Sequence, residues 1–226
     1  MNILIRTALF FFLLFPAAAF SAQPATGCHC FRDRTFNPAD TFASDGYLLT
    51  TVFNSLTASY FSIPKRQIVM LKMKGGVHNE DLLIALYAGS RMGLEATDLL
   101  AEKKDGSWQQ VLAEKQVPQS LRHDELYNRI REGLPVEDAA GDIIREILND
   151  RFGIMPESFA ALVRQGASLR EIALIFTLAE HVRTTPETIF SQYHDWGFSW
   201  SQIAHNFGLQ PADVGKLADS RQAETR

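Results

Sequence analysis

The residues best suited to chemistry stand together near the N-terminus, in the order Cys28-His29-Cys30. Two thiolates and an imidazole suit Cu(I) or zinc, although a complete metal site would need further ligands from elsewhere in the chain. The sequence has no other cysteine, so a disulfide between the two is a second interpretation, either as a redox element or as a clip of the N-terminal segment. Acylation of Cys28, as in a lipoprotein, is a third. The structural clip is the simplest of these.

Motifs that usually identify an enzyme or a cofactor site are missing from the rest of the sequence. It contains no G-x-S-x-G nucleophile elbow, no H-E-x-x-H zinc motif, no glycine-rich phosphate loop and no C-x-x-C-H haem site. His181, His194 and His205 lie on successive predicted helices and could converge, but surface or hydrogen-bonded roles are commoner for single histidines. The sequence therefore predicts no cofactor and favours a protein that is not an enzyme.

Residues 1–21 have the order of a secretory signal peptide. A short segment with one arginine precedes an unbroken apolar run over residues 8–15, and small residues follow. Ala19 and Ser21 occupy the −3 and −1 positions of a cleavage site after Ser21. The run is short for a membrane span, which needs about 20 residues, so an uncleaved anchor is only the alternative. We expect export to the periplasm or cell envelope, with membrane association only if the leader stays uncleaved or Cys28 is acylated.

Composition and charge limit the class of partner. The 226 residues include 46% hydrophobic and 21% charged residues, which is enough apolar material for an ordinary globular core. The formal net charge is −4. A weakly acidic chain creates no general field that attracts phosphate backbones or anionic lipids. We therefore expect no nucleic-acid partner.

The sequence overlays itself when it is shifted by about 90 residues, which predicts two tandem copies of one helical unit. Two unrelated helical segments of similar composition would match apolar classes, but they would not readily repeat Phe-x-Ile near Pro, then Gly, then Ser-Trp in one order. The matched pairs include Phe61 with Phe152, Ile63 with Ile154, Pro64 with Pro156, Gly76 with Gly166, and Ser107-Trp108 with Ser199-Trp200.

From residue 47 onward, apolar residues recur at helical spacing, so the expected fold is all-α. Each copy of roughly 70–80 residues is predicted to form five short helices. They are expected at 47–60, 65–73, 79–91, 96–104 and 107–115 in the first copy, and at 138–151, 156–164, 168–182, 186–194 and 199–206 in the second.

These helices divide the chain into segments. The first repeat covers residues 47–117 and the second covers 138–218, with a connecting helix and linker at 118–137, in which apolar residues at helical spacing predict the helix over 120–131. A polar stretch with few helical signals, residues 22–46, is expected to form an extended arm that carries Cys28 and Cys30. Residues 219–226 are polar and are expected to be a flexible tail.

Trp108 and Trp200 occupy equivalent places just inside two predicted helices, where we expect them to be packing anchors rather than a binding platform. The segment 199–218 resembles a helix-turn-helix motif, because small residues would let two helices cross closely. Its second helix carries Lys216 as its only cation, which is poor for contact with bases and phosphates, so we expect a helical hairpin.

No motif names a reaction, so the sequence predicts a function only by class. The best expectation is an exported, non-enzymatic helical-repeat protein with a binding or structural role and a possible protein partner in the cell envelope. Three alternatives remain. They are a periplasmic enzyme that acts on cell-wall material, a DNA-binding protein that uses residues 199–218, and a metal or redox protein that uses Cys28, His29 and Cys30.

Overall fold

The computed structural model describes residues 31–104 and 106–219, and within them every regular element is a helix, which confirms the predicted all-α fold. The predicted signal peptide, Cys28, His29 and Cys30 lie outside the described residues. In chain order the helices are α1 (Asp45–Tyr60), α2 (Lys65–Gly75), α3 (Asn79–Met92), α4 (Ala96–Lys103), α5 (Trp108–Ala113), the 3₁₀ turn η1 (Gln119–Leu121), α6 (Glu125–Arg131), α7 (Val136–Phe152), α8 (Pro156–Arg164), α9 (Leu169–Val182), α10 (Pro186–His194), α11 (Trp200–Asn206) and α12 (Pro211–Asp219).

Side-chain caps explain why several helices begin where the sequence predicts. The Ser107 hydroxyl accepts the Gln110 amide in a capping box at the start of α5, and the Ser199 hydroxyl accepts the Gln202 amide at the start of α11. A proline occupies the first turn of α8 and of α10, where a missing N–H costs no hydrogen bond. Gly76 ends α2 with a positive φ of 61°.

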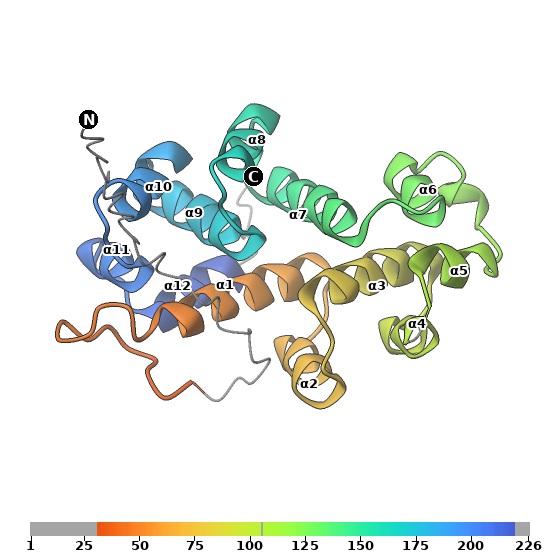
Figure 1. The fold of residues 1–226 in the computed structure, drawn as a ribbon, viewed down its shortest axis with the longest axis horizontal. Helices are drawn as coiled ribbons and strands as arrows, with labels where there is room; N and C mark the ends of the chain where they lie inside the picture. The colour runs from red at the N-terminus through yellow and green to blue at the C-terminus, as the bar shows by residue number, and fades with distance from the viewer. Residues whose placement is uncertain (1–30, 105, 220–226) are drawn as a thin grey trace, which may run out of the picture.

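Helix α1 lies at the centre of the fold and packs against α12, α9 and α2 (Figure 1). Its apolar residues Leu48, Val52 and Leu56 are fully buried. It can approach α12 closely because α12 has a glycine at the crossing: a Cβ on Gly215 would lie 3.0 Å from the Thr51 side chain.

Helix α3 follows α1 along the long axis of the molecule, and α7 and α9 lie beside this pair (Figure 1). The α3–α4 connection is tight. A Cβ on Gly89 would lie 2.7 Å from the backbone oxygen of Leu94, and the Leu94 amide donates to the Gly89 oxygen. Only glycine fits at this position without moving backbone atoms.

Helices of the segment 47–117 pack against helices of the segment 138–218. Helix α1 packs on α9 and α12, and α7 packs on α3, so each of these two helices contacts the other segment extensively. The connection between the segments contains η1 and α6 instead of one helix over 120–131, because Asp124 caps α6 by accepting the Tyr127 amide.

The arm was expected to be extended, but its described part, residues 31–44, ends in a series of turns. The Asn37 side chain accepts the Ala39 amide, and this local bond competes with extended backbone. The turns place the Thr41 carbonyl against the start of α11, where it accepts hydrogen bonds from the Ser199 and Ser201 hydroxyls at 2.6 and 2.5 Å.

Among the described helices, none combines the length and the apolar character that crossing a bilayer requires.

Candidate functional site

A groove of about 410 Å³ lies between α6, α7 and the start of α8. Helix α7 contributes one face, since residues at spacings of three, four and seven lie on the same side of a helix. The lining residues are Glu125, Leu126 and Arg129 from α6, Asp142, Arg145, Glu146 and Asn149 from α7, Ile154 from the α7–α8 connection, and Pro156 from the start of α8. The groove therefore combines charged walls with a small apolar floor.

Asp142 holds two arginines of this groove in place. One of its oxygens is 2.8 Å from Arg129 Nη1 and the other is 2.8 Å from Arg145 Nη2. The arginine side chains are 44% and 47% exposed, whereas the carboxylate side chain is 15% exposed. One carboxylate thus orients two guanidinium groups, and the trio carries a net positive charge.

Behind the groove, Glu146 belongs to a polar cluster that joins four elements. We call Tyr60, Tyr87, Arg91, Asp124 and Glu146 the Arg91 cluster. Arg91 forms an ion pair with Glu146 and lies 3.7 Å from Asp124, and the Tyr60 hydroxyl donates to Glu146 at 2.8 Å. The Tyr87 hydroxyl is 3.0 Å from both oxygens of Asp124, and its ring lies 5.0 Å below the Arg91 guanidinium. These contacts tie the ends of α1 and α3 to α6 and α7.

Both tyrosines of the cluster are donors and not phenolates. Burial, followed by the hydrogen bond to Glu146, raises the pKa of Tyr60 well above its ordinary value. Burial and the nearby carboxylates raise the pKa of Tyr87 in the same direction. The Arg91 cluster is therefore suited to hold side chains in position, because it presents no activated oxygen nucleophile.

A second set of buried polar groups lies between α1 and α2. Lys65 donates to the Thr51 and Ser55 hydroxyls at 2.6 and 2.7 Å, and Lys72 donates to the side-chain oxygen Oδ1 of Asn54 at 2.5 Å. Burial, reinforced by the positive charge of Arg170, lowers the pKa of Lys72 to about 7. A neutral amine is a nucleophile, but Lys72 is only 7% exposed, so a substrate would reach it only after α2 moved.

Trp108 and Trp200 are 3% and 1% exposed, and each indole N–H donates to a carboxylate in the first turn of another helix. Trp108 Nε1 is 2.7 Å from Asp81 of α3, and Trp200 Nε1 is 3.2 Å from Glu171 of α9. Tyr193 also stacks on Trp200 with ring centroids 4.2 Å apart. Neither indole offers a face to a ligand.

The three histidines of the second segment do not converge. His194 bonds to its neighbour Asp195, His205 stacks on Phe36 at 4.3 Å, and His181 is exposed in the last turn of α9. Within residues 31–104 and 106–219, no three His, Cys, Asp or Glu side chains are grouped to hold a metal ion.

Helices α11 and α12 form the predicted hairpin shape, but α12 turns one face inward. Val214, Gly215 and Ala218 are buried, with Gly215 against α1. On the outer face Lys216 is paired with Asp213 at 3.1 Å. This arrangement leaves α12 little cationic surface for a nucleic acid.

Sequence reasoning identified neither the groove nor the Arg91 cluster. The signal that was available is the set of polar residues at 142, 145, 146 and 149, three of them charged, on one face of α7. The partners come from α1, α3 and α6, and no local spacing relates these elements.

Comparison of the chain with protein-family models, with curated proteins and with solved structures finds no match.

Proposed function

We propose that this chain is an exported, non-enzymatic protein of the cell envelope, built from two tandem helical units, and that its groove between α6 and α7 binds an acidic segment of a partner protein. The observation that carries the binding site is the pair Arg129 and Arg145, both oriented by the single carboxylate of Asp142. The secretory character of residues 1–21 supports the location.

Two equivalent contacts support the tandem duplication. The indole of Trp108 donates to Asp81, and the indole of Trp200 donates to Glu171, in each case from the first turn of the fifth helix to the first turn of the third helix of a unit. The packing of α1 on α9 is likewise matched by the packing of α7 on α3. The first helix of each proposed unit therefore packs on the third helix of the other, so the two units share one core instead of folding separately.

The arginine pair supports the choice of an anionic ligand. A guanidinium has five N–H donors in a planar fork, and Asp142 engages one nitrogen of each arginine. A second carboxylate bound across the two forks would gain charge-assisted hydrogen bonds with little loss of side-chain entropy, since both arginines are already oriented.

The floor and the size of the groove support a peptide segment over a free ion. Ile154 and Leu126 are apolar and line the groove together with the arginines, and about 410 Å³ accommodates several side chains. An acidic residue followed by an apolar one matches this lining. Glu125 adds a negative charge at the edge and selects against ligands that carry acidic groups on that side.

Fluorescence anisotropy with a labelled peptide of alternating Leu and Glu residues tests the proposal, with a Leu-Lys peptide as the reference. The double variant Arg129→Gln/Arg145→Gln should bind the acidic peptide about tenfold more weakly or worse, which corresponds to about 1.4 kcal/mol. Arg66→Gln/Arg164→Gln removes two exposed arginines elsewhere and should change affinity little. Glu125→Gln should tighten binding.

Equal binding of the acidic and basic peptides, or equal losses in the two double variants, would refute the groove as an acidic-peptide site. The enzymatic alternative has its own readout: release of soluble fragments from purified cell wall by the wild type, and their absence after Glu146→Gln. Glu146 is the groove carboxylate that is held by Arg91 and Tyr60, so this substitution tests it as the reacting group.

A further inference from the structure

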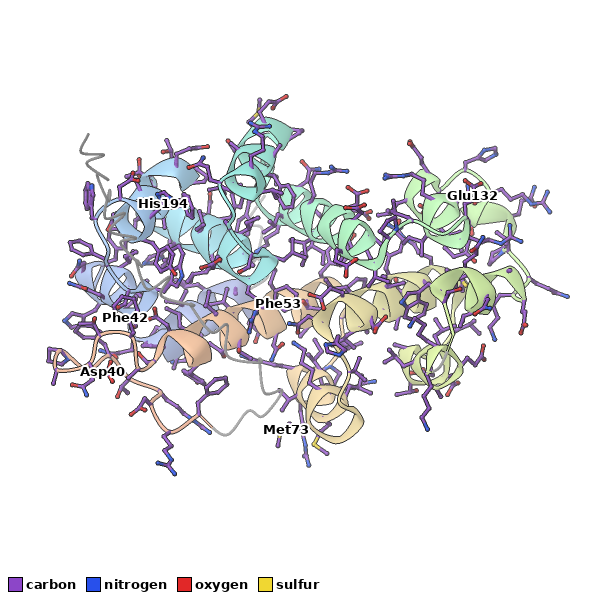
Figure 2. The ribbon with its side chains drawn as sticks, viewed as in Figure 1. Asp40, Phe42, Phe53, Met73, Glu132 and His194 are labelled. Carbon is purple, nitrogen blue, oxygen red and sulfur yellow. The ribbon has the colours of Figure 1, made fainter. Side chains whose placement is uncertain are left out.

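Two large aromatic side chains are exposed at the end of the molecule that holds α10 and α11. Trp196 is 62% exposed and Phe42 is 56% exposed. Figure 2 shows Phe42 beside Asp40 at this end, far along the long axis from Glu132. Rings of this size normally contribute strongly to a core or an interface, so their exposure asks for an explanation.

The hydrogen bonds of the arm bring these rings together. The Ser199 hydroxyl donates to the carbonyl of Thr41, the residue before Phe42. Phe198, the residue before Ser199, meets Trp196 edge-on with ring centroids 5.9 Å apart. Phe42 and the Trp196–Phe198 pair therefore flank one hydrogen bond between the arm and α11, and we call these three residues the aromatic rim.

Hydrogen bonds at the start of α11 hold the backbone next to the aromatic rim. Ser199 and Ser201 are completely buried, and the Asp45 carboxylate accepts the amides of Trp200 and Ser201 at 3.0 and 2.7 Å. Because the backbone beneath the rim is held by these bonds, the rings are presented in a preset arrangement. Preorganisation of this kind lowers the entropic cost of binding a surface.

The described chain also begins at this end. The ring of Phe31 packs 5.8 Å from that of Tyr47 in the first turn of α1, and the amide of Asp45 donates to the Phe42 carbonyl. The segment that precedes Phe31 in sequence contains the apolar run at residues 8–15 and Cys28. The point at which that segment joins the described chain is therefore close to the part of the arm that carries Phe42.

We propose that the aromatic rim is a membrane-docking face that inserts its rings into the interface of a lipid bilayer. Tryptophan and other amphipathic aromatic rings are enriched at that depth of membranes. A single acyl chain binds a membrane only marginally, so stable attachment needs a second contact, and the rim supplies one whether or not Cys28 is acylated. This goes beyond the proposed function, because the rim is a different surface from the groove.

Charge favours insertion over attraction to anionic headgroups. Arg32 and Arg34 on the arm are offset by Asp33 and Asp40, and Asp195 precedes Trp196. With no surplus of positive charge, the driving force is burial of ring area, which salt does not screen. Binding should therefore be nearly the same on neutral and on anionic vesicles.

Intrinsic fluorescence reports the docking directly. Of the three tryptophans, Trp108 and Trp200 are buried at 3% and 1% exposure, so Trp196 is the one that meets solvent. The protein purified from the envelope is mixed with phosphatidylcholine vesicles whose acyl chains carry bromine, a quencher that acts only within the bilayer. The emission of Trp196 should shift to the blue and be quenched, while Trp196→Phe should show neither change.

Flotation supplies a second measurement. Phe42→Ser/Trp196→Ser should lower the vesicle partition coefficient about tenfold or more, and the matched control Met73→Ser/Val163→Ser, which alters two other exposed apolar residues, should not. Circular dichroism checks that both variants fold. The proposal would be overturned by an absence of quenching in the wild type or by an equal loss of vesicle binding in the control variant. A blue shift that depends on protein concentration without vesicles would also overturn it, because it would assign the rim to contact with a second copy of the chain.

Discussion

The buried amine of Lys72 should make the stability of this protein rise with pH over a range in which few other groups titrate. In the folded chain the pKa of Lys72 is lowered to about 7, mainly by burial, whereas a solvated lysine has a pKa of about 10.4. Between these two values the unfolded chain holds a proton that the folded chain has lost. The unfolding free energy therefore increases with pH in this window, by up to about 1.4 kcal/mol for each pH unit.

Between pH 7 and 9 the expected gain from this one group is about 2–3 kcal/mol. Lys72→Met keeps an unbranched side chain of similar length and removes the titrating amine, so its curve should lack that gain. Lys65, whose pKa is also lowered by burial, remains in both proteins and cancels in the difference. The range stops at pH 9 because the tyrosines Tyr60 and Tyr87, with raised pKa values, lower stability only as pH rises beyond about 10.

Urea unfolding followed by circular dichroism at several pH values measures this difference. From pH 7 to 9 the unfolding free energy of the wild type should rise steadily relative to that of Lys72→Met. Lys104→Met removes an exposed lysine, and its unfolding free energy should change with pH as that of the wild type does. Parallel curves for the wild type and Lys72→Met would show that the amine is hydrated in solution, and the argument from burial would fail.

Three further predictions follow from packing and hydrogen bonds. Gly89→Ala should destabilise the protein by about 1–3 kcal/mol because its Cβ meets a backbone oxygen, whereas Gly141→Ala, with open space around it, should stabilise by about 0.5–1 kcal/mol in the same thermal unfolding assay. Asp45→Ala removes the carboxylate that accepts the first amides of α11 and should cost about 1–3 kcal/mol, with faster hydrogen exchange at those amides and not in α7. Tyr60→Phe removes the hydroxyl that donates to Glu146 and should cost about 1–2 kcal/mol in urea unfolding, and an unchanged midpoint would contradict the role given to the Arg91 cluster.

Local signals were sufficient for most of the secondary structure. The expected helices 156–164 and 186–194 match α8 and α10 at both ends, and the agreement at the first residue follows from the proline that starts each one. The connection 118–137 was less predictable. Its apolar stripe fits one helix over 120–131, but the Asp124 side chain captures an amide and begins a new helix there, after a separate 3₁₀ turn.

The groove and the buried lysines could not be predicted by the same means, because their partners are distant in the sequence. Arg91 and Glu146 are 55 residues apart, and Tyr60 and Glu146 are 86 apart. Nothing in the sequence of α2 distinguishes Lys72 from an exposed lysine; its burial follows from the way α2 lies on α1. Pattern reasoning can place a charge on a helix face, but only the packing of helices decides which charges meet.

The two proposed surfaces lie at different places along the long axis. The aromatic rim is at the end formed by α10 and α11, and α6, which forms one wall of the groove, lies toward the other end (Figure 1). If the rim rests on a bilayer, the α6 wall of the groove lies away from that bilayer, where a soluble partner can reach it. The Arg91 cluster, the packing of α1 on α9 and the packing of α7 on α3 connect the parts of the molecule that carry the two surfaces. Binding at the groove should therefore leave the bromine quenching of Trp196 unchanged, and a groove ligand that relieved this quenching would show that the two surfaces compete.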